Sequence, residues 1–300
     1  MPYPRLKRLS LHVPILGRVV QQRDELRALN NQLTAELGQL TIERDQLREQ
    51  LDEELAILET ILGAVTRSQD SPYGVGYCHC CRRRSVFEIY GSWLRDEYLC
   101  LRCRSIPRQR HLQYVLDTQF PGWEQALVHE SSPTNDFLSR WCKNYSSSQY
   151  FDGVHSGESV DGVRCEDLEK LSFADESIDI FITQDVFEHV FHPELAVKEI
   201  ARVLKPGGAH VFTVPRLYWV ETSKPRARLT QAGIEHLEEP SYHGNPVGDG
   251  KALVTWDYGQ DFENLIEAWS GLKTTTYNAV DRSLGIDGEF REVFVSRKPT

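Results

Sequence analysis

The sequence has no apolar run that approaches the roughly 20 residues a membrane-spanning helix needs, so we expect no transmembrane segment. Its short N-terminal apolar stretch is interrupted by Pro14 and has no small-residue cleavage site after it, which argues against a secretory signal. The net charge of -10 argues against broad, nonspecific coating of nucleic acid. We therefore expect a cytoplasmic protein. Residues 1–18 form a basic tail, and a peripheral membrane contact through Arg5, Lys7 and Arg8 stays open.

Residues 19–66 are almost free of glycine and proline, and two series of positions repeat there every seven residues. The series are Leu26, Leu33, Leu40, Leu47 and Ile61, and Asn30, Leu37, Arg44, Leu51, Leu58 and Val65. Their offset, alternately four and three residues, is typical of the a and d positions of a coiled coil. Asn30 at an a position favours a parallel homodimer, because two facing asparagines bond each other only in register. The alternative is a single amphipathic helix packed on the rest of the chain.

Five of the seven cysteines fall between positions 78 and 103, which favours a metal site in a reducing compartment over a disulfide scaffold. Cys78 and Cys81 form one C-x-x-C pair, and Cys100 and Cys103 form another. Four thiolates on two tight turns would give the tetrahedral site that zinc prefers. Cys80 in place of Cys81, and a redox role for the pairs, remain alternatives.

The two cysteine pairs belong to a predicted zinc-ribbon-like module over residues 67–118, which begins with a linker at 66–77. Strands are expected at VFEIY and DEYL, on either side of Gly91. Arginines gather around the pairs: Arg82, Arg83, Arg84, Arg95, Arg102, Arg104, Arg108 and Arg110. They could form an anion or RNA contact surface, or a solvated face that complements the acidic remainder of the chain.

From residue 119 to 300, strand-like and helix-like stretches alternate, which predicts a layered α/β fold. The predicted strands are ALVHE, QYF, IDIFITQ, AHVFTVP, KTTTYNAV and EFREVFVSRK, and the predicted helices are DFLSRWCKNY, HPELAVKEIARVL and DFENLIEAWSGL. The last two strands would pair as a hairpin through residues 281–288. Cys142 and Cys165 stand apart from the pairs and are expected in the core.

The segment after the first of these strands, ALVHESSPTND at residues 126–136, contains no glycine. A nucleotide-binding α/β protein usually has a glycine-rich loop there, because glycine permits positive φ and a close approach of backbone to ligand. Serine is small enough for the close approach, and we expect Asn135 to supply the left-handed conformation.

The stretch CEDLEKLSFADESIDIFITQDVFEHVFHPELAVKEIARVLKPGGAHVFTVP, from Cys165 to Pro215, resembles class I S-adenosylmethionine (SAM)-dependent methyltransferases. The resemblance covers residues 119–300 and implies a Rossmann-like sheet of seven strands with helices on both faces. IEHLEEPSYHGNP and WDYGQDF resemble a bacterial subgroup that carries Glu-Ser-Ser in place of the glycine-rich loop. CLRCRSIPRQRHL resembles zinc-ribbon segments that precede some of these domains.

The resemblance implies that SAM is the cofactor and assigns residues to each part of it. Glu130 matches the acid of the first motif, Ser131 and Ser132 would line the methionine end, and Asp167 and Leu168 match the position beside adenine. Asp152 is the candidate for the ribose hydroxyls, a role that Tyr150 or Gln149 could share. Gln184 and Asp185, after the fourth strand, would face the point where the sulfonium and the acceptor meet.

An acceptor hydroxyl must lose a proton during methyl transfer, and histidine is the natural base near neutral pH. The candidates are His189, His236 and His243. We expect transfer to a hydroxyl or amine of a small molecule or glycan. An RNA methyltransferase that binds through the arginines is an alternative, although the sequence lacks an N-P-P-[YF] motif. A non-catalytic scaffold is the other alternative, supported only by the missing glycines.

Overall fold

The computed structural model describes residues 12–65, 72–244 and 250–300. The chain divides into two compact units, Met1–Ile61 and Leu62–Thr300. The predicted zinc-ribbon-like module and the predicted methyltransferase domain therefore fold together within the second unit. Arg5, Lys7 and Arg8 of the predicted basic tail lie outside the described residues.

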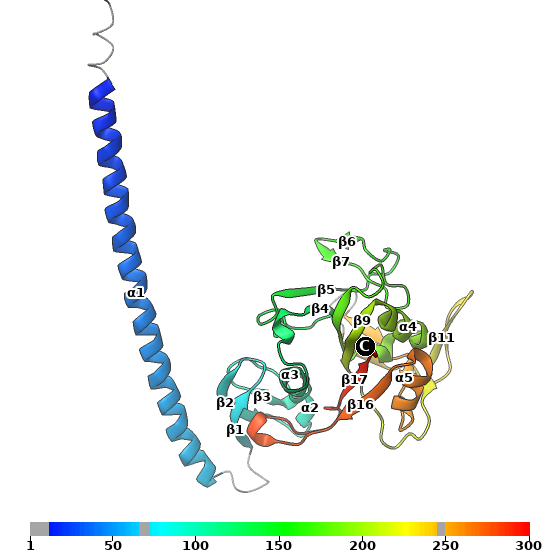
Figure 1. Cartoon of the computed structure of the whole chain (residues 1–300). Helices are drawn as coiled ribbons and strands as arrows, with labels where there is room; N and C mark the ends of the chain where they lie inside the picture. Colours follow the sequence, from blue (N-terminus) through cyan, green and yellow to red (C-terminus); the bar gives the residue numbers. More distant parts are fainter. Residues whose placement is uncertain (1–11, 66–71, 245–249) are drawn as a thin grey trace, which may run out of the picture. The chain divides into compact units, whose positions relative to one another are not determined.

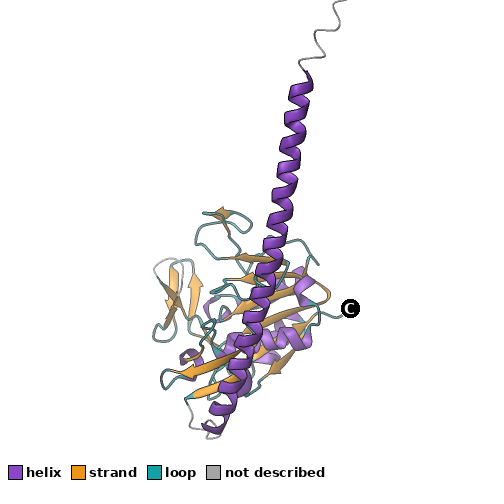
Figure 2. Cartoon of the chain, turned by 90° about the vertical axis from the view of Figure 1, so that its left-hand side faces the viewer, coloured by secondary structure: helices purple, strands orange, loops and turns teal. Residues whose placement is uncertain are grey.

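The first unit is dominated by a single helix, α1 (His12–Val65), of 54 residues (Figures 1 and 2). The helix begins before residue 19, where the sequence predicted its start. Pro14 lies in the first turn, where its missing N–H costs no intrahelical hydrogen bond. The seam leucines are exposed in the single chain, with 66% for Leu26 and 65% for Leu37. Among the described residues, no helix combines the length and apolarity that crossing a membrane requires.

The second unit begins with a three-stranded antiparallel sheet that carries the cysteine pairs. Its elements are β1 (Tyr73–Cys78), β2 (Arg83–Ile89), a short helix α2 (Leu94–Glu97) and β3 (Tyr98–Cys100). The strand predicted at VFEIY is confirmed, and the one at DEYL only in part, because Asp96 and Glu97 belong to α2. The linker prediction is wrong from residue 73 onward, because β1 pairs with β2 along its whole length. Gly76 is required there, since a Cβ would lie 1.8 Å from the Ser283 carbonyl oxygen.

Helix α3 (Pro107–Gln119) follows and was not predicted. Its sequence, PRQRHLQYVLDTQ, is mostly polar, so its apolar face is narrow. Leu112, Val115 and Leu116 form that face and are buried against the large sheet. The helix thus joins the cysteine-bearing sheet to the rest of the second unit.

The large sheet has six strands, in which β4, β5, β8 and β9 run parallel and β17 pairs antiparallel with β9 and β16. In spatial order the strands are β16 (Lys273–Tyr277), β17 (Val293–Arg297), β9 (Leu204–Thr213), β8 (Ile178–Gln184), β4 (Leu127–Ser131) and β5 (Asn144–Ser148). The predicted strands at 126–130, 178–184 and 209–215 and the terminal hairpin are confirmed.

Two expectations for this sheet are corrected. Residues 136–142 form turns instead of a helix, and β5 starts at Asn144, ahead of the predicted QYF strand. The Asn135 side chain accepts a hydrogen bond from the Phe137 N–H at 3.1 Å, which favours a turn over a helix. The described residues form six strands here rather than seven. Beyond β5, Cys165 makes only an isolated parallel bridge to Gln149.

Alternating side chains of the sheet build a core on each face. On one face, Val128, Ile180 and Val211 pack with α3. On the other face lie helices α4 (Pro193–Val203) and α5 (Phe262–Ser270), which lie next to each other in Figure 1. Phe181, Phe212 and Phe294 pack there with Ile200 and Phe262. Both helices were predicted, and α5 ends at Gly271 in the left-handed conformation.

An insert of short strand pairs separates β9 from α5. It comprises β10 (Lys224–Pro225) with β15 (Trp256–Asp257), β11 (Ala227–Thr230) with β12 (Gly233–His236), and β13 (Tyr242–Gly244) with β14 (Lys251–Leu253). The remaining elements are β6 (Ser159–Val160), β7 (Val163–Arg164) and the 3₁₀ turns η1 (Trp123–Gln125), η2 (Phe187–His189) and η3 (Arg282–Leu284).

Candidate active site

The four parallel strands end at one edge of the sheet, where an open α/β fold binds its ligands. The segments that leave this edge carry most of the predicted site residues. Ser131 and Ser132 end β4, Asp152 follows β5, and Gln184 and Asp185 end β8. Parallel pairing therefore gathers residues that are up to 54 positions apart in the chain.

Glu130 lies one residue before the end of β4, and its side chain is only 1% exposed. Tyr145 Oη donates to one carboxylate oxygen at 2.7 Å, and Gln184 Nε2 donates to the other at 2.7 Å. Burial raises the pKa of Glu130 to about 7, although both hydrogen bonds act to lower it. The structure thus brings Glu130 and Gln184 together. It adds Tyr145, which the sequence analysis did not identify because the contact depends on the β4–β5 register.

The raised pKa of Glu130 makes stability depend on pH. The unfolded chain releases this proton near pH 4.5, whereas the folded chain holds it to about pH 7. Stability therefore falls as pH rises between those values, by up to about 3 kcal/mol. Glu130→Gln should remove this loss. The free energy of unfolding of the variant, measured with denaturant, should therefore rise relative to that of the wild type between pH 4.5 and pH 8. Glu267→Gln, at an exposed carboxylate, is the control. If the difference in free energy of unfolding between Glu130→Gln and the wild type stays constant across this pH range, the raised pKa of Glu130 is contradicted.

The loop after β4 takes its left-handed residue at Ser132, whose φ is 54°. Asn135, which we expected to supply that conformation, is not among the positive-φ residues of the described chain, so that expectation is wrong. The Ser132 N–H donates to the Ser148 carbonyl at 2.8 Å, and this bond extends the β4–β5 pairing into the loop. Serine therefore occupies the position where glycine would be the less strained residue.

Asp152 and Asp167 lie in different loops, and the negative charges of both act on Tyr150. The pKa of Tyr150 is raised by burial and then by the negative charges of Asp152 and Asp167. Asp152 is exposed, whereas Leu168 is buried. Asp167 donates its N–H to Ser156 Oγ at 2.9 Å and accepts from the Glu169 N–H at 2.9 Å. Asp167 follows Cys165, which forms a parallel bridge with Gln149, so the residues predicted for ribose and adenine both come just after the end of β5 or of its bridged neighbour.

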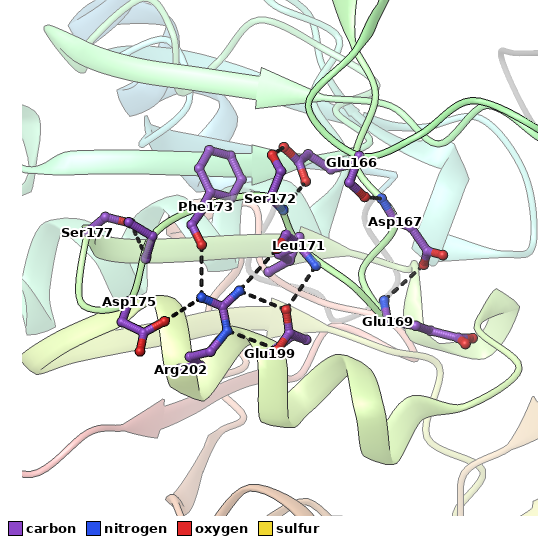
Figure 3. A network of polar contacts seen from close by, with 12 residues as sticks. Glu166, Asp167, Glu169, Leu171, Ser172, Phe173, Asp175, Ser177, Glu199 and Arg202 are labelled. Atoms are coloured by element: carbon purple, nitrogen blue, oxygen red, sulfur yellow. Dashed lines mark hydrogen bonds and ion pairs between the residues drawn. The ribbon is translucent and has the colours of Figure 1, made fainter.

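The loop that carries Asp167 is fixed to α4 by Arg202 (Figure 3). Its guanidinium donates to the carbonyls of Phe173 and Leu171 at 2.8 and 3.1 Å and pairs with Glu199 at 2.8 Å. Glu199 in turn accepts from the Leu171 N–H at 3.0 Å. Because α4 packs on the sheet, these bonds position the Asp167 turn relative to the strand ends.

Asp185, directly after β8, takes a left-handed φ of 52°. Its carboxylate pairs with Arg95 of α2 and with Arg108 of α3, the latter at 2.9 Å, and accepts from Thr213 Oγ1 at 2.7 Å. Burial alone would raise its pKa, but Arg108 and then Arg95 outweigh burial and hold the pKa below its ordinary value. Two arginines of the predicted RNA-contact cluster therefore reach the edge of the sheet where the candidate site lies.

Of the three candidate bases, the structure brings two together. His189 lies in η2 and His243 in β13, with ring centroids 5.1 Å apart. Between them is the carboxylate of Glu188, which is 1% exposed. His236 is exposed on β12, in a surface hairpin with β11, and does not belong to this group.

The four cysteines of the predicted zinc site have Sγ atoms that all lie within 4.8 Å of one another. Cys81 belongs to the group and Cys80 does not, so the structure favours the first of the two alternatives. The hydroxyl of Ser85 lies 3.1 Å from Cys100 Sγ. Hydrogen bonds from the neighbouring thiols, Cys103 first, hold the pKa of Cys100 below its ordinary value. A cluster of four cysteine sulfurs at these mutual distances fits a zinc ion.

The arginine cluster is not one solvated face. Arg110 is fully buried, and its guanidinium donates to the carbonyls of Tyr98 and Gly285, both at 2.8 Å, and of Ser105. Arg82 pairs with Glu124 at 2.7 Å. The exposed members are Arg83, Arg84, Arg102 and Arg104. About half of the predicted RNA-contact surface is thus engaged within the protein, and an RNA substrate stays a prediction.

The fold agrees with the layered α/β architecture that the sequence predicts. It has a mixed sheet with four parallel strands and an antiparallel β16–β17 pair, flanked by helices on both faces, with six described strands where the resemblance implied seven. Residues 141–212 match the family model described as a methyltransferase domain. This match overlaps the stretch from Cys165 to Pro215 on which the resemblance rested.

Two relatives match part of the chain, and one of them is a methyltransferase. Over 139 residues the chain is 39% identical to a ubiquinone biosynthesis O-methyltransferase from Parvibaculum lavamentivorans, covering 42% of this chain and 54% of that protein. Over 131 residues it is 28% identical to an uncharacterized 37.1 kDa protein in transposon TN4556 from Streptomyces fradiae, covering 43% of this chain and 37% of that protein. The chain spans only between about a third and about half of these relatives.

A solved SAM-dependent methyltransferase from Mesorhizobium loti aligns with a TM-score of 0.42 at 13% identity, over 63% of this chain and 98% of that one. The family match and the O-methyltransferase relative support the prediction of a SAM-dependent methyltransferase over the residues that they cover. The residue roles, the zinc ion, the coiled-coil dimer and the acceptor stay predictions.

Proposed function

We propose that the protein transfers a methyl group from SAM to a hydroxyl or amine of a small molecule or glycan, at the carboxyl ends of β4, β5 and β8. In this reaction the cofactor supplies the leaving group. The protein aligns the sulfonium methyl with the acceptor and, for a hydroxyl acceptor, helps to remove its proton.

The observation that carries the proposal is the meeting of polar side chains at the ends of β4 and β8, where Gln184 donates to Glu130 and keeps an amide oxygen without a partner among the described residues. Asp152 and Asp167, in the loops after β5 and β7, are the candidates for contact with the ribose and adenine of SAM. Asp152 is exposed and can accept hydrogen bonds from a ribose diol. Leu168, buried at 5% exposure, would form part of the apolar wall beside adenine.

At the methionine end, Ser131 and Ser132 would supply backbone and hydroxyl groups. The amide oxygen of Gln184 is buried and has no hydrogen-bond partner among the described residues, so a donor from the ligand could satisfy it. Glu130 suits direct contact with the SAM amino group less well, because both of its oxygens already accept hydrogen bonds. Its role in the proposal is to position Gln184 beneath the loop.

Asp152→Ala should weaken SAM binding about 10- to 100-fold, because hydrogen bonds to a charged group contribute roughly 1.5–3 kcal/mol. Calorimetric titration of the full chain with SAM measures the change. Glu267→Ala removes an exposed carboxylate from α5 and should bind SAM like the wild type. Equal affinities for both variants would contradict the assignment of Asp152.

On the acceptor side, the O-methyltransferase relative favours a hydroxyl acceptor. In this proposal Gln184 and Asp185 adjoin the place where the methyl group is transferred. Glu188 and His189 follow them in η2, and His243 comes from β13. Either histidine could take the acceptor proton. His236 is a weaker candidate, because it lies in a separate exposed hairpin.

The four cysteines hold a structural zinc ion in this proposal. The support is their chemistry and their mutual distances. The cysteine-bearing sheet also supplies Arg95 to Asp185 through α2. A zinc ion would therefore stabilise a module that contributes a side chain to the edge of the candidate site.

The proposed parallel homodimer forms through the seam of α1. Leu37 and Leu51 occupy a positions and are 65% and 39% exposed in the single chain, so a second copy could cover them. The double variant Leu37→Lys and Leu51→Lys should convert a dimer to a monomer in analytical ultracentrifugation. Ile42→Lys, at an f position that is 60% exposed, should remain dimeric. A monomeric wild type, or equal behaviour of the variants, would contradict the dimer.

A further inference from the structure

Glu188 is a buried carboxylate without a matching donor. It is 1% exposed, and neither oxygen has a hydrogen-bond partner among the described residues. An isolated buried charge is costly, and buried carboxylates are normally hydrogen-bonded, paired or bound to a metal ion. The arrangement therefore calls for a cation or a donor that would satisfy this carboxylate.

The two neighbouring histidines lie at distances that suit shared ligation better than hydrogen bonding. His243 Nδ1 is 3.5 Å from Glu188 Oε1, and His189 Nε2 is 3.8 Å from the same oxygen. Both distances exceed the roughly 3.2 Å limit of an N–H···O hydrogen bond. Two ligands about 2.1 Å from a tetrahedral ion lie about 3.4 Å apart. All three ligand atoms fall within 4.8 Å of one another.

The orientation of His189 is also that of a metal ligand. Its Nδ1 lies 2.8 Å from the Leu253 carbonyl, which can only accept, so Nδ1 carries the proton. Nε2 is then left with a lone pair that faces the carboxylate. Metal-binding histidines usually donate their other N–H to a carbonyl or carboxylate in this way.

The main chain fixes this group from two sides. Thr255 donates its N–H to the Glu188 carbonyl at 2.7 Å, which ties η2 to the segment after β14. β14 pairs with β13, so that Ala252 of β14 lies opposite His243 of β13. The hairpin that places His243 thus also supplies the carbonyl that orients His189.

We propose that Glu188, His189 and His243 bind a divalent transition-metal ion of the Zn²⁺, Fe²⁺ or Co²⁺ type. Two imidazoles and one carboxylate suit these ions, whereas Mg²⁺ and Ca²⁺ prefer oxygen ligands. Three protein ligands leave at least one position open for an oxygen of the acceptor. A bound ion lowers the pKa of a coordinated hydroxyl, which would assist proton removal in place of a histidine base. That acceptor role depends on the proposed function; metal binding itself does not.

Metal content of the full chain tests the site. After chelation and reloading with Zn²⁺, the wild type should retain one equivalent in addition to the ion held by the four cysteines. Glu188→Gln and the double variant His189→Asn, His243→Asn should each lose that equivalent. His155→Asn, at an exposed histidine, should keep it. Glu188→Gln removes an uncompensated buried charge, so it should fold at least as stably as the wild type, and unfolding would not explain the loss.

A second probe separates the two sites. Co²⁺ held by thiolates gives a sulfur-to-metal charge-transfer band, whereas Co²⁺ held by imidazole and carboxylate does not. The wild type should show both kinds of spectrum, and the double histidine variant only the thiolate kind. A wild type without the extra equivalent, or a double variant that keeps it, would overturn the proposal. SAM titration of the zinc-loaded double histidine variant, which keeps the ion at the four cysteines, reports separately on the proposed function.

Discussion

Arg110→Met should destabilise the protein by on the order of 4 kcal/mol and lower its melting temperature by roughly 10 °C. The Arg110 guanidinium is fully buried and donates to the carbonyls of Tyr98, Ser105 and Gly285. It also lies 4.8 Å from the ring centroid of Phe87. Methionine would fill most of the volume but take a donor away from all three buried carbonyls, of which Ser105 keeps the Cys100 N–H at 3.0 Å, and each such loss is costly.

Controls for this prediction come from the same cluster. Arg83→Met replaces an exposed arginine and should change the free energy of unfolding by less than about 0.5 kcal/mol. Arg110→Lys should recover little, because an ammonium group cannot reproduce the planar fork of the guanidinium. Guanidinium chloride unfolding at fixed pH measures all three. If Arg110→Met and Arg83→Met are equally stable, Arg110 does not join these segments.

Cys81→Ser should abolish binding of the structural zinc ion and reduce stability by more than about 4 kcal/mol. Cys81 supplies one of four Sγ atoms that lie within 4.8 Å of one another. Without a fourth thiolate the remaining three would hold zinc weakly, and the sheet β1–β2–β3 would lose its main crosslink. Thermal unfolding and metal analysis of the purified chain measure both effects.

Cys80→Ser is the matched control. Cys80 is buried beside the cluster, and its carbonyl accepts from Trp141 Nε1 at 2.9 Å, but its thiol is outside the group of four. This variant should keep the zinc ion and lose far less stability. If Cys80→Ser releases zinc and Cys81→Ser does not, the ligand assignment is reversed.

Elements with strong local patterns could be predicted from the sequence. The apolar run at Ile178–Gln184 forms a buried strand, and the amphipathic repeat at Pro193–Val203 forms a helix with one buried face. In both segments the spacing of the apolar residues fits only the structure that is observed. The helix prediction at residues 136–142 was wrong because local propensity and tertiary structure disagree there. Their propensity favoured a helix, but the Asn135 turn and the pairing of β5 with β4 prevail in the folded chain.

Candidate site residues could be predicted from the sequence where they directly follow a strand. Contacts between side chains of different strands or distant segments could not be predicted, because they depend on how those segments pair in the folded chain. Glu130, Asp167 and Gln184 could be placed from the resemblance. The contact of Tyr145 with Glu130 depends on neighbouring parallel strands, and the contact of His243 with Glu188 spans 55 positions of the chain. Arg110 shows a further limit, since a cluster of arginines does not reveal which of them points inward.

The Glu-Ser-Ser loop determines whether this domain is still an enzyme. Ser132 already holds the left-handed conformation that a glycine would provide, so the missing glycines do not prevent the loop from forming. The loop is supported by Glu130, Tyr145 and Gln184 below it. This arrangement is compatible with a cofactor cradle built without glycine.

Calorimetric titration of the zinc-loaded full chain with SAM and with its demethylated product tests the central claim most directly. We expect saturable binding of both with micromolar dissociation constants, on the order of 8 kcal/mol of binding free energy. Absence of binding at millimolar cofactor would contradict the enzyme assignment and leave a scaffold with a methyltransferase fold.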